Sequence, residues 1–343
     1  MTAPRITVLM PVLNAENHLP EALESVWRQT FCDYELLAVD DGSTDRTPEI
    51  LAACRDPRLR VLRNETRRKL AGALNRGLEE ARGEFIARMD ADDLMRPDRL
   101  ALQMAHLERH PEIGCCGGWA RTFGDGPRKT LIFPGGAEQV QACALFYSPF
   151  AHPTVMFRRE PFEKEGLRYD GSYYPTEDYE LWSRAIRKLA CDNLQRVLVD
   201  YRVHGKSMTG GEWSDMDEQT VRVQRRMLAQ LKIDPSEKEA RLHRESSMGW
   251  LPPTKESFAR TDAWLRRLEE ANRSSRIFDP EALADVLNFV WFRMTMAVVR
   301  KMGREAARLY LQSPLAGYGS HSRSRRWIVR GAAWKTSLAG RRG

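Results

Sequence analysis

Two aspartates at alternate positions, Asp90 and Asp92, stand in the run MDADD with one alanine between them. The apolar segment before them is typical of a strand. In an extended segment residues i and i+2 share a face, so both carboxylates can approach one hard divalent cation and the phosphate that it carries. Three acids after an apolar strand are costly to cluster unless a cation balances them. The run therefore favours a metal site over a solvated loop, and Mg²⁺ and Mn²⁺ both suit such oxygen ligands.

A second acidic pair, Asp40 and Asp41, ends another apolar segment in the run DDGSTD. A carboxylate there can accept hydrogen bonds from a nucleobase or a ribose, and Gly42 lets the backbone pass close to a ligand. Aspartate, glycine and serine are also ordinary turn formers, so a simple turn is the alternative.

A third pair, Glu177 and Asp178, lies in the run PTEDYELW. Thr176 could cap a helix whose first turn holds these acids, and the helix dipole favours that arrangement without any catalysis. The functional interpretation makes Asp178 a general base that takes a proton from an attacking hydroxyl. From this pair alone the capping and the catalytic interpretations are equally well supported.

The segments around the acidic runs alternate between two kinds of pattern. Four are apolar, as strands are: 5–12, which is rich in β-branched residues, 34–42, 58–64 and 83–93. Three helices are expected among them: 18–30, one that begins near Thr47 and Pro48, and 68–82. This succession predicts an α/β fold with a mainly parallel sheet and helices on both faces. Ligands bind at the carboxyl ends of the strands in such folds, which is where the acids of the first two runs fall.

The chain after residue 93 has a weaker pattern. A helix is expected at 97–110, and the glycines at 117–126 suit short or antiparallel strands and loops. A helix at 177–189 and a strand at 196–203 follow, and the remainder reads as mostly helical.

Charge divides the chain of 343 residues into two parts. Residues 232–343 hold 22 basic and 12 acidic residues, net +10, whereas 1–231 hold 32 and 35, net −3. We therefore expect a domain of residues 1–231 that contains the acidic runs, and a helical, basic region of residues 232–343.

Composition and the chain's start argue against several classes of protein. The six cysteines form no C-x-x-C pair, so neither a zinc site nor a disulfide framework is indicated. The N-terminal segment MTAPRITVLMPVLNAE reads as a strand and not as a signal peptide. No window reaches the roughly 18 uninterrupted apolar residues of a membrane span. A cytoplasmic protein is expected.

The order of the motifs resembles the family 2 glycosyltransferases, nucleotide-sugar enzymes with the GT-A fold. The matching stretches span about residues 4 to 210: ITVLMPVLNAENHLPEALESVWRQT, YELLAVDDGSTDRTPEIL, LAGALNRGLEEARGEFIARMDADDLMRPDRL, HPTVMFRRE, TEDYELWSRAIRK and YRVHGKSMT. By this resemblance residues 1–231 would be a GT-A catalytic domain, Rossmann-like with a mainly parallel mixed sheet. The enzyme would transfer a sugar from a nucleotide-diphosphate sugar, UDP-sugar being favoured, with inversion of configuration at the anomeric carbon. The acceptor would be a hydroxyl group of a saccharide or of a lipid-linked molecule in polysaccharide or glycolipid synthesis.

The resemblance also implies roles for single residues. Asp41 would contact the nucleobase of the donor, and Asp92 would bind Mn²⁺ or Mg²⁺. Asp178 would be the general base that takes the acceptor proton. The remaining expected site residues are Pro11 and Asn14 beside the nucleobase, Asp90 towards the ribose or metal, His204 near the metal, and His152 and Glu177 near the diphosphate or acceptor.

Two positions depart from the family pattern. Family members often have glycine where Lys69 stands and arginine where Leu74 stands, although Lys69 or Arg68 could still meet phosphate. The Q-x-x-R-W motif of processive members is missing, which indicates that one sugar is added per encounter.

The end of the chain is strongly basic. After Val286 it carries 12 basic residues and one acid, Glu305, and on a helical wheel the arginines at 293, 300, 304 and 308 fall on one side. Residues 286–343 could rest on an anionic membrane and hold the enzyme at its inner face. The alternative is a helix packed on the catalytic domain with a solvated basic face.

Two other functions fit parts of the sequence. A metal-dependent phosphotransferase or phosphatase would use Asp90 as nucleophile and Asp92 as acid, but it usually has threonine or valine where Leu94 stands. A nucleic-acid-binding protein would use the basic region, but residues 1–231 are net negative and contain no nucleic-acid motif. Nucleic acid is not an expected partner.

Overall fold

The computed structural model describes residues 3–204 and 213–339. The chain forms two compact units, which are described separately: Met1–Val140 with Ser148–Gln219, and Gln141–Tyr147 with Thr220–Gly343. Along the chain the main change of unit falls between Gln219 and Thr220. The domain boundary expected after residue 231 stays a prediction.

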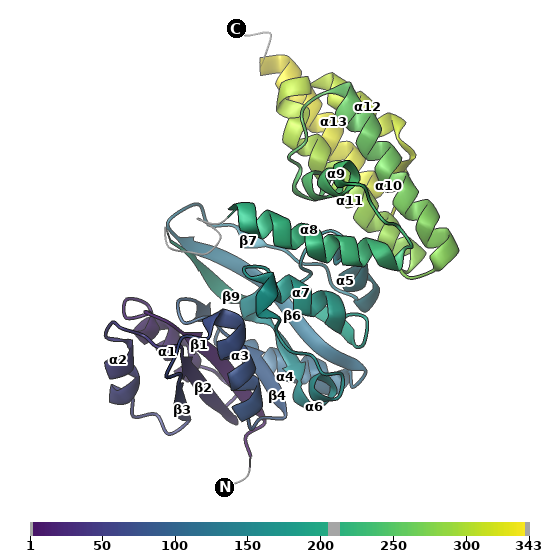
Figure 1. The fold of residues 1–343 in the computed structure, drawn as a ribbon. Coiled ribbons are helices and arrows are strands. Elements are labelled where there is room, and N and C mark those ends of the chain that lie inside the picture. The colour runs from purple at the N-terminus through teal and green to yellow at the C-terminus, as the bar shows by residue number, and fades with distance from the viewer. Residues whose placement is uncertain (1–2, 205–212, 340–343) are drawn as a thin grey trace. The chain divides into compact units, whose positions relative to one another are not determined.

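The first unit is built on a nine-stranded sheet in the order β3-β2-β1-β4-β8-β6-β9-β5, with β7 paired to β6 (Figure 1). One half is the parallel sheet expected from the sequence, since β1 pairs in parallel with β2 and β4, and β2 with β3. These strands are Ile6–Val12 (β1), Tyr34–Asp40 (β2), Leu59–Arg63 (β3) and Phe85–Arg88 (β4). Every residue of β1, β2 and β4 is buried, as in a sheet covered on both faces.

The other half of the sheet is mixed. Strand β8 is antiparallel to β4 and β6, β9 is parallel to β6, and β5 is antiparallel to β9. The strands are Leu94–Met95 (β5), Ile113–Gly124 (β6), Thr130–Leu131 (β7), Met156–Arg158 (β8) and Ala190–Val203 (β9).

Most of the glycine-rich stretch lies in one long strand, β6, which is antiparallel to β7 and β8, where short or antiparallel strands and loops were expected. The glycines are required by close packing: a Cβ at Gly117 would lie 2.6 Å from the Asn193 side chain, and one at Gly118 would lie 2.5 Å from Leu198. Both neighbours belong to β9, so small residues let the two strands and their side chains fit.

Helices cover both faces of this sheet, which confirms the α/β prediction. Leucines and other apolar residues of α1 and α4 pack against β1 and β4 in one core, and each buried side chain of this kind stabilises the fold by roughly 1.5–3 kcal/mol. The helices are Leu19–Trp27 (α1), Thr47–Ala53 (α2), Lys69–Glu80 (α3), Arg99–Arg109 (α4), Ala137–Cys143 (α5), Arg159–Lys164 (α6) and Glu177–Ala185 (α7).

The second unit is helical, as predicted. Local signals set its helix ends: Ser236 and Glu239 form a capping box, and Asp279 caps a helix that has Pro280 in its first turn. The helices are Trp213–Gln230 (α8), which leads into the unit, Glu237–Met248 (α9), Lys255–Ser275 (α10), Pro280–Met302 (α11), Arg304–Gln312 (α12) and Ser322–Ala339 (α13).

Helix α11 is the core helix of this unit. By length and composition it could cross a membrane, but 67% of its most apolar window is buried inside the protein. It ends at Met302, and Gly303 (φ 56°, ψ −128°) turns the chain into α12. The basic residues expected on one side of a continuous helix therefore belong to two separate helices.

Candidate active site

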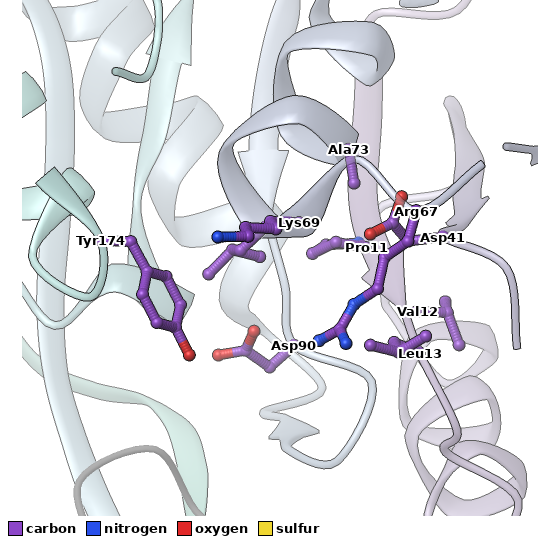
Figure 2. A pocket seen from close by; sticks show the side chains of 10 residues that line it. Pro11, Val12, Leu13, Asp41, Arg67, Lys69, Ala73, Asp90 and Tyr174 are labelled. Atoms are coloured by element: carbon purple, nitrogen blue, oxygen red, sulfur yellow. The ribbon is translucent and has the colours of Figure 1, made fainter. Parts of the chain in front are cut away.

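A cavity of about 590 Å³ opens at the carboxyl ends of the parallel strands of the first unit. Figure 2 shows Asp41, Arg67, Lys69, Asp90 and Tyr174 around it. The cavity is lined by Pro11, Val12, Leu13, Asp41, Arg67, Lys69, Leu70, Ala73, Asp90 and Tyr174. Four of the residues expected to bind the donor are thus brought together: Pro11, Asp41, Lys69 and Asp90.

Asp41 and Asp40 have different environments despite being neighbours. Asp41 lines the cavity, and its Oδ1 accepts hydrogen bonds from Asn64 Nδ2 at 2.6 Å and from the backbone N–H of Arg68 at 2.8 Å. The buried Asp40 accepts a hydrogen bond from the backbone N–H of Ser43 and closes the turn. Asp40 therefore fits the turn interpretation of this run, whereas a ligand-binding role for Asp41 stays a prediction.

Asn14, also expected beside the nucleobase, is not among the described residues that line the cavity. Its Oδ1 accepts the backbone N–H of Thr44 at 2.8 Å, and its own backbone N–H donates to Ser43 Oγ. These bonds join the loop after β1 to the loop after β2. A direct role in donor binding stays a prediction.

The acidic run after β4 brings three carboxylates together. One oxygen each of Asp90, Asp92 and Asp93 lies within 4.8 Å of the others. Burial and the neighbouring carboxylates raise the pKa of Asp93 well above its ordinary value, although the Arg202 backbone N–H donates to Asp93 Oδ1 at 2.7 Å. Its buried Oδ2 has no partner in the part of the chain that the structure describes. A hard divalent cation would relieve this repulsion and satisfy that oxygen, so these residues fit the expected metal.

His204 lies beside this cluster. Its Nε2 is 3.0 Å from Asp92 Oδ2, and a role near the metal stays a prediction. The end of the motif YRVHGKSMT, residues 205–209, lies outside the described residues.

A buried cation, Arg88, compensates part of this negative charge. It ends β4, is only 3% exposed, and donates to the carboxylate of Asp90. Its positive charge also acts to lower the pKa of Asp178 and of Glu177. The sequence interpretation missed Arg88, although a charged residue at the end of an otherwise apolar strand could have revealed it.

The acidic pair expected at the acceptor side begins helix α7. Glu177 is 2% exposed, both its carboxylate oxygens lack a partner among the described residues, and burial raises its pKa to about 7. Burial also raises the pKa of Asp178, which feels the charges of Arg88 and Asp90. Thr176 precedes the helix, but its hydroxyl donates to the Tyr173 carbonyl and does not cap the helix as the sequence suggested.

His152 lies in an aromatic cluster and does not line the cavity. Its Nε2 is 2.8 Å from Tyr169 Oη, and its ring is 6.0 Å from that of Trp182. Burial, followed by the charge of Arg88, lowers the pKa of His152 well below its ordinary value, so the ring is neutral. A role near the diphosphate stays a prediction.

Arg67 before α3 and Lys69 at the start of α3 supply positive charge to the cavity. Lys69 has a backbone φ of +59°, which explains why glycine suits this position, and its ammonium lies 5.8 Å from the Tyr174 ring centre. Arg67, and not Arg68, is the arginine that lines the cavity. Leu74 is fully buried in the core, so the second departure from the family pattern falls outside the cavity lining. Sequence reasoning missed both Arg67 and Tyr174.

The fold is that of the GT-A glycosyltransferases. A crystal structure of S. aureus TarS 1-349 in complex with UDP-GlcNAc is similar with a TM-score of 0.57 and 18% identity, covering 98% of this chain and 92% of that one. The mannosyltransferase PcManGT of Pyrobaculum calidifontis, in complex with GDP-Man and Mn²⁺, is similar with a TM-score of 0.50 and 19% identity, covering 98% of this chain and 87% of that one.

Sequence comparison gives the family. The family model for glycosyl transferase family 2 matches residues 7–166. The putative glycosyltransferase EpsE of Bacillus subtilis is 35% identical over 207 residues, 59% of this chain and 74% of EpsE. The succinoglycan biosynthesis protein ExoO of Rhizobium meliloti is 31% identical over 199 residues, 55% of this chain and 56% of ExoO. The chain belongs to glycosyl transferase family 2 and is a glycosyltransferase.

Proposed function

We propose that the protein transfers a sugar from a nucleotide-diphosphate sugar to a hydroxyl acceptor, with inversion and one sugar per encounter. The observation that carries this proposal is the cavity lined by both Asp41 and Asp90, with the other acids of the metal-binding run beside Asp90. A nucleobase is recognised by hydrogen-bonding groups, whereas a diphosphate is recognised by cations. The cavity offers Asp41 for the first purpose, and Arg67, Lys69 and the metal-binding acids for the second.

Asp41 would accept a hydrogen bond from the donor base, with Pro11 and the loop fixed by Asn14 beside it. Its Oδ1 is already fixed by Asn64 and the Arg68 backbone, so the carboxylate is oriented before the donor binds. The imide N–H of uracil could donate to such an acceptor. The family resemblance makes UDP-sugar the favoured donor.

Positive groups would meet the diphosphate. Arg67 and Lys69 line the same cavity and are suited to phosphate oxygens. A divalent cation, Mn²⁺ or Mg²⁺, would be held by Asp92 with help from Asp90, Asp93 and His204, and would supply Lewis-acid stabilisation of the leaving diphosphate.

Asp178 would act as the general base. The acceptor oxygen bonds to the anomeric carbon as the bond from that carbon to the diphosphate oxygen breaks, and the acceptor proton passes to the Asp178 carboxylate. A pKa raised by burial makes this carboxylate a stronger base than a solvated aspartate. Glu177 and His152 would support the acceptor or diphosphate side.

The acceptor is proposed to be a saccharide or a lipid-linked sugar in cell-surface polysaccharide or glycolipid synthesis. ExoO, a similar protein, is a succinoglycan biosynthesis protein, which supports this class of product. A cytoplasmic protein, peripheral at the inner face of the membrane, would meet such acceptors.

Thermal denaturation with nucleotide diphosphates and nucleotide sugars, each with and without Mn²⁺, tests the proposal. We expect UDP and a UDP-sugar to raise the melting temperature more than GDP does, and only when metal is present. Release of nucleotide diphosphate from the stabilising donor would then be measured with added saccharide acceptors. Stabilisation by no nucleotide at all would contradict the proposed function.

A further inference from the structure

Helix α13 exposes two tryptophans on one face. Trp327 is 75% exposed and Trp334 is 61% exposed. They are seven residues apart, which places them on the same side of a helix. Ile328 beside them is 41% exposed. Large aromatic side chains gain much from burial, so two of them projecting from one helix face indicate a contact surface.

The opposite face of α13 is anchored within the second unit. Val329 and Ala333 are buried, and Arg325 Nη1 donates to Asn288 Oδ1 at 2.6 Å. The same guanidinium pairs with Asp285 of α11 at 3.2 Å. The helix is therefore held in place by its inner side, and this fixes which face it turns outward.

The exposed face is basic as well as aromatic. The sequence of α13 holds no acid, and besides the inward-facing Arg325 it carries Arg323, Arg326 and Arg330, of which Arg326 is partly exposed. Arg323 and Arg330 are exposed and lie close to the two tryptophans on the helical wheel. Arg304 of α12 adds another positive charge, since its guanidinium lies 6.0 Å from the Trp334 ring centre.

We propose that this face of α13 docks on an anionic lipid surface, with the tryptophans at the level of the headgroups and the arginines against lipid phosphates. Tryptophan is favoured at membrane interfaces, and clustered basic residues are attracted to anionic leaflets. The membrane contact expected anywhere in residues 286–343 is thus assigned to one face of α13. Helix α11 is not part of it, because most of its apolar window is buried inside the protein. The proposal deepens the proposed function, because it rests on an enzyme that uses a membrane-bound acceptor.

Co-sedimentation of the full chain with vesicles tests this docking. We expect binding to vesicles of phosphatidylcholine mixed with phosphatidylglycerol, and little binding to phosphatidylcholine alone. The double variant Trp327→Ala/Trp334→Ala should weaken binding at least about tenfold. The triple variant Arg323→Gln/Arg326→Gln/Arg330→Gln should weaken it about 100-fold, because each basic residue near an anionic surface strengthens binding roughly fivefold.

Matched variants on other parts of the same unit provide the controls. Trp250→Ala removes a tryptophan that is 47% exposed outside α13. Arg260→Gln/Arg266→Gln/Arg273→Gln removes three exposed charges from α10. Both controls should still sediment with the anionic vesicles, and all the variants should keep the melting temperature of the unaltered protein, since the changed side chains lie at the surface.

Three results would overturn the docking proposal. The first is equal recovery with neutral and anionic vesicles, and the second is unchanged binding by the α13 variants. The third is a dimer in light scattering that disappears with Trp327→Ala/Trp334→Ala, because the face would then hold a second copy of the chain. Nucleotide-dependent stabilisation is measured without lipid, so failure of the donor-binding proposal and failure of membrane docking are separate outcomes.

Discussion

The buried guanidinium of Arg88 pairs with the carboxylate of Asp90, two residues further along the chain, at the point where β4 reaches the cavity. Asp90 lines the cavity and belongs to the acidic cluster, whereas Arg88 faces inward and is only 3% exposed. One interior cation therefore stabilises a carboxylate that projects toward the ligand.

Removing this cation should damage both the fold and the site. Arg88→Met leaves Asp90 without its partner, and we expect a loss of about 3–5 kcal/mol in the free energy of unfolding, measured with urea. Arg88→Lys should recover part of the stability because it keeps the charge. Arg88→Met/Asp90→Asn should recover stability without recovering turnover. If the double variant is as unstable as Arg88→Met, the cost does not come from an unpaired Asp90.

Asp178→Asn tests the proposed base. The amide has the same shape but cannot take the acceptor proton, so turnover should fall about 10²- to 10⁴-fold. The donor dissociation constant should stay within about twofold, since the interaction is made only in the transition state. A steady-state assay of nucleotide diphosphate release, with calorimetric donor binding beside it, separates the two quantities. Retention of most turnover would remove Asp178 from the mechanism.

Asp92→Ala tests the metal site. Because Asp92 belongs to the acidic cluster and its Oδ2 lies 3.0 Å from His204 Nε2, its loss should weaken Mn²⁺-dependent donor binding at least about tenfold. His204→Ala should have a smaller effect of the same kind. Asp98→Ala, an exposed acid of the first unit outside the cluster, is the control and should bind donor normally. An Asp92→Ala protein that responds to Mn²⁺ like the unaltered one would exclude this residue as a ligand.

Variants of Lys69 separate the effect of its backbone strain on stability from the effect of its positive charge on donor binding. Its φ of +59° is unfavourable for any residue with a Cβ, so Lys69→Gly should raise the free energy of unfolding by about 1 kcal/mol. Lys69→Ala should bring no such gain. Both variants remove the ammonium and should raise the donor KM to a similar extent. A normal KM in both would mean that Lys69 does not contact the donor.

The ends of the parallel strands were predictable from the sequence because local patterns determine them. Asp41 and Asp90 each follow an apolar run, and parallel strands bring their carboxyl ends to one edge. The contribution of Arg67 and Tyr174 was not predictable, since it depends on loops whose spacing carries no period. The same holds for β6, whose glycines read as loop residues until the packing against Asn193 and Leu198 is known.

Long-range pairing explains the other differences. Strands β6 and β9 are parallel, and Cys115 lies opposite Cys191 although many elements separate them along the chain. Nothing local specifies such a register.

The break at Gly303 also escaped prediction, because the helical wheel drawn through it assumed one continuous helix. A single glycine does not reveal whether the chain continues or turns.

Glu177 should make stability depend on pH in a defined direction. Burial raises its pKa to about 7 in the folded protein, whereas an unfolded glutamate has a pKa near about 4.3. Between these values the folded chain holds a proton that the unfolded chain has released, so the free energy of unfolding falls as pH rises through this window. The full effect is about 4 kcal/mol, because the two pKa values differ by about 2.7 and each unit of pKa corresponds to about 1.4 kcal/mol.

Glu177→Gln isolates this contribution, because the amide stays neutral and similar in size. We expect the variant and the unaltered protein to differ little near pH 4.5, and the variant to become the more stable by up to about 4 kcal/mol above pH 7. Urea unfolding at several pH values measures the difference, and the other titrating groups cancel because both proteins share them. A difference that stays constant with pH would show that Glu177 is ionised in the folded state, held by a partner or by water.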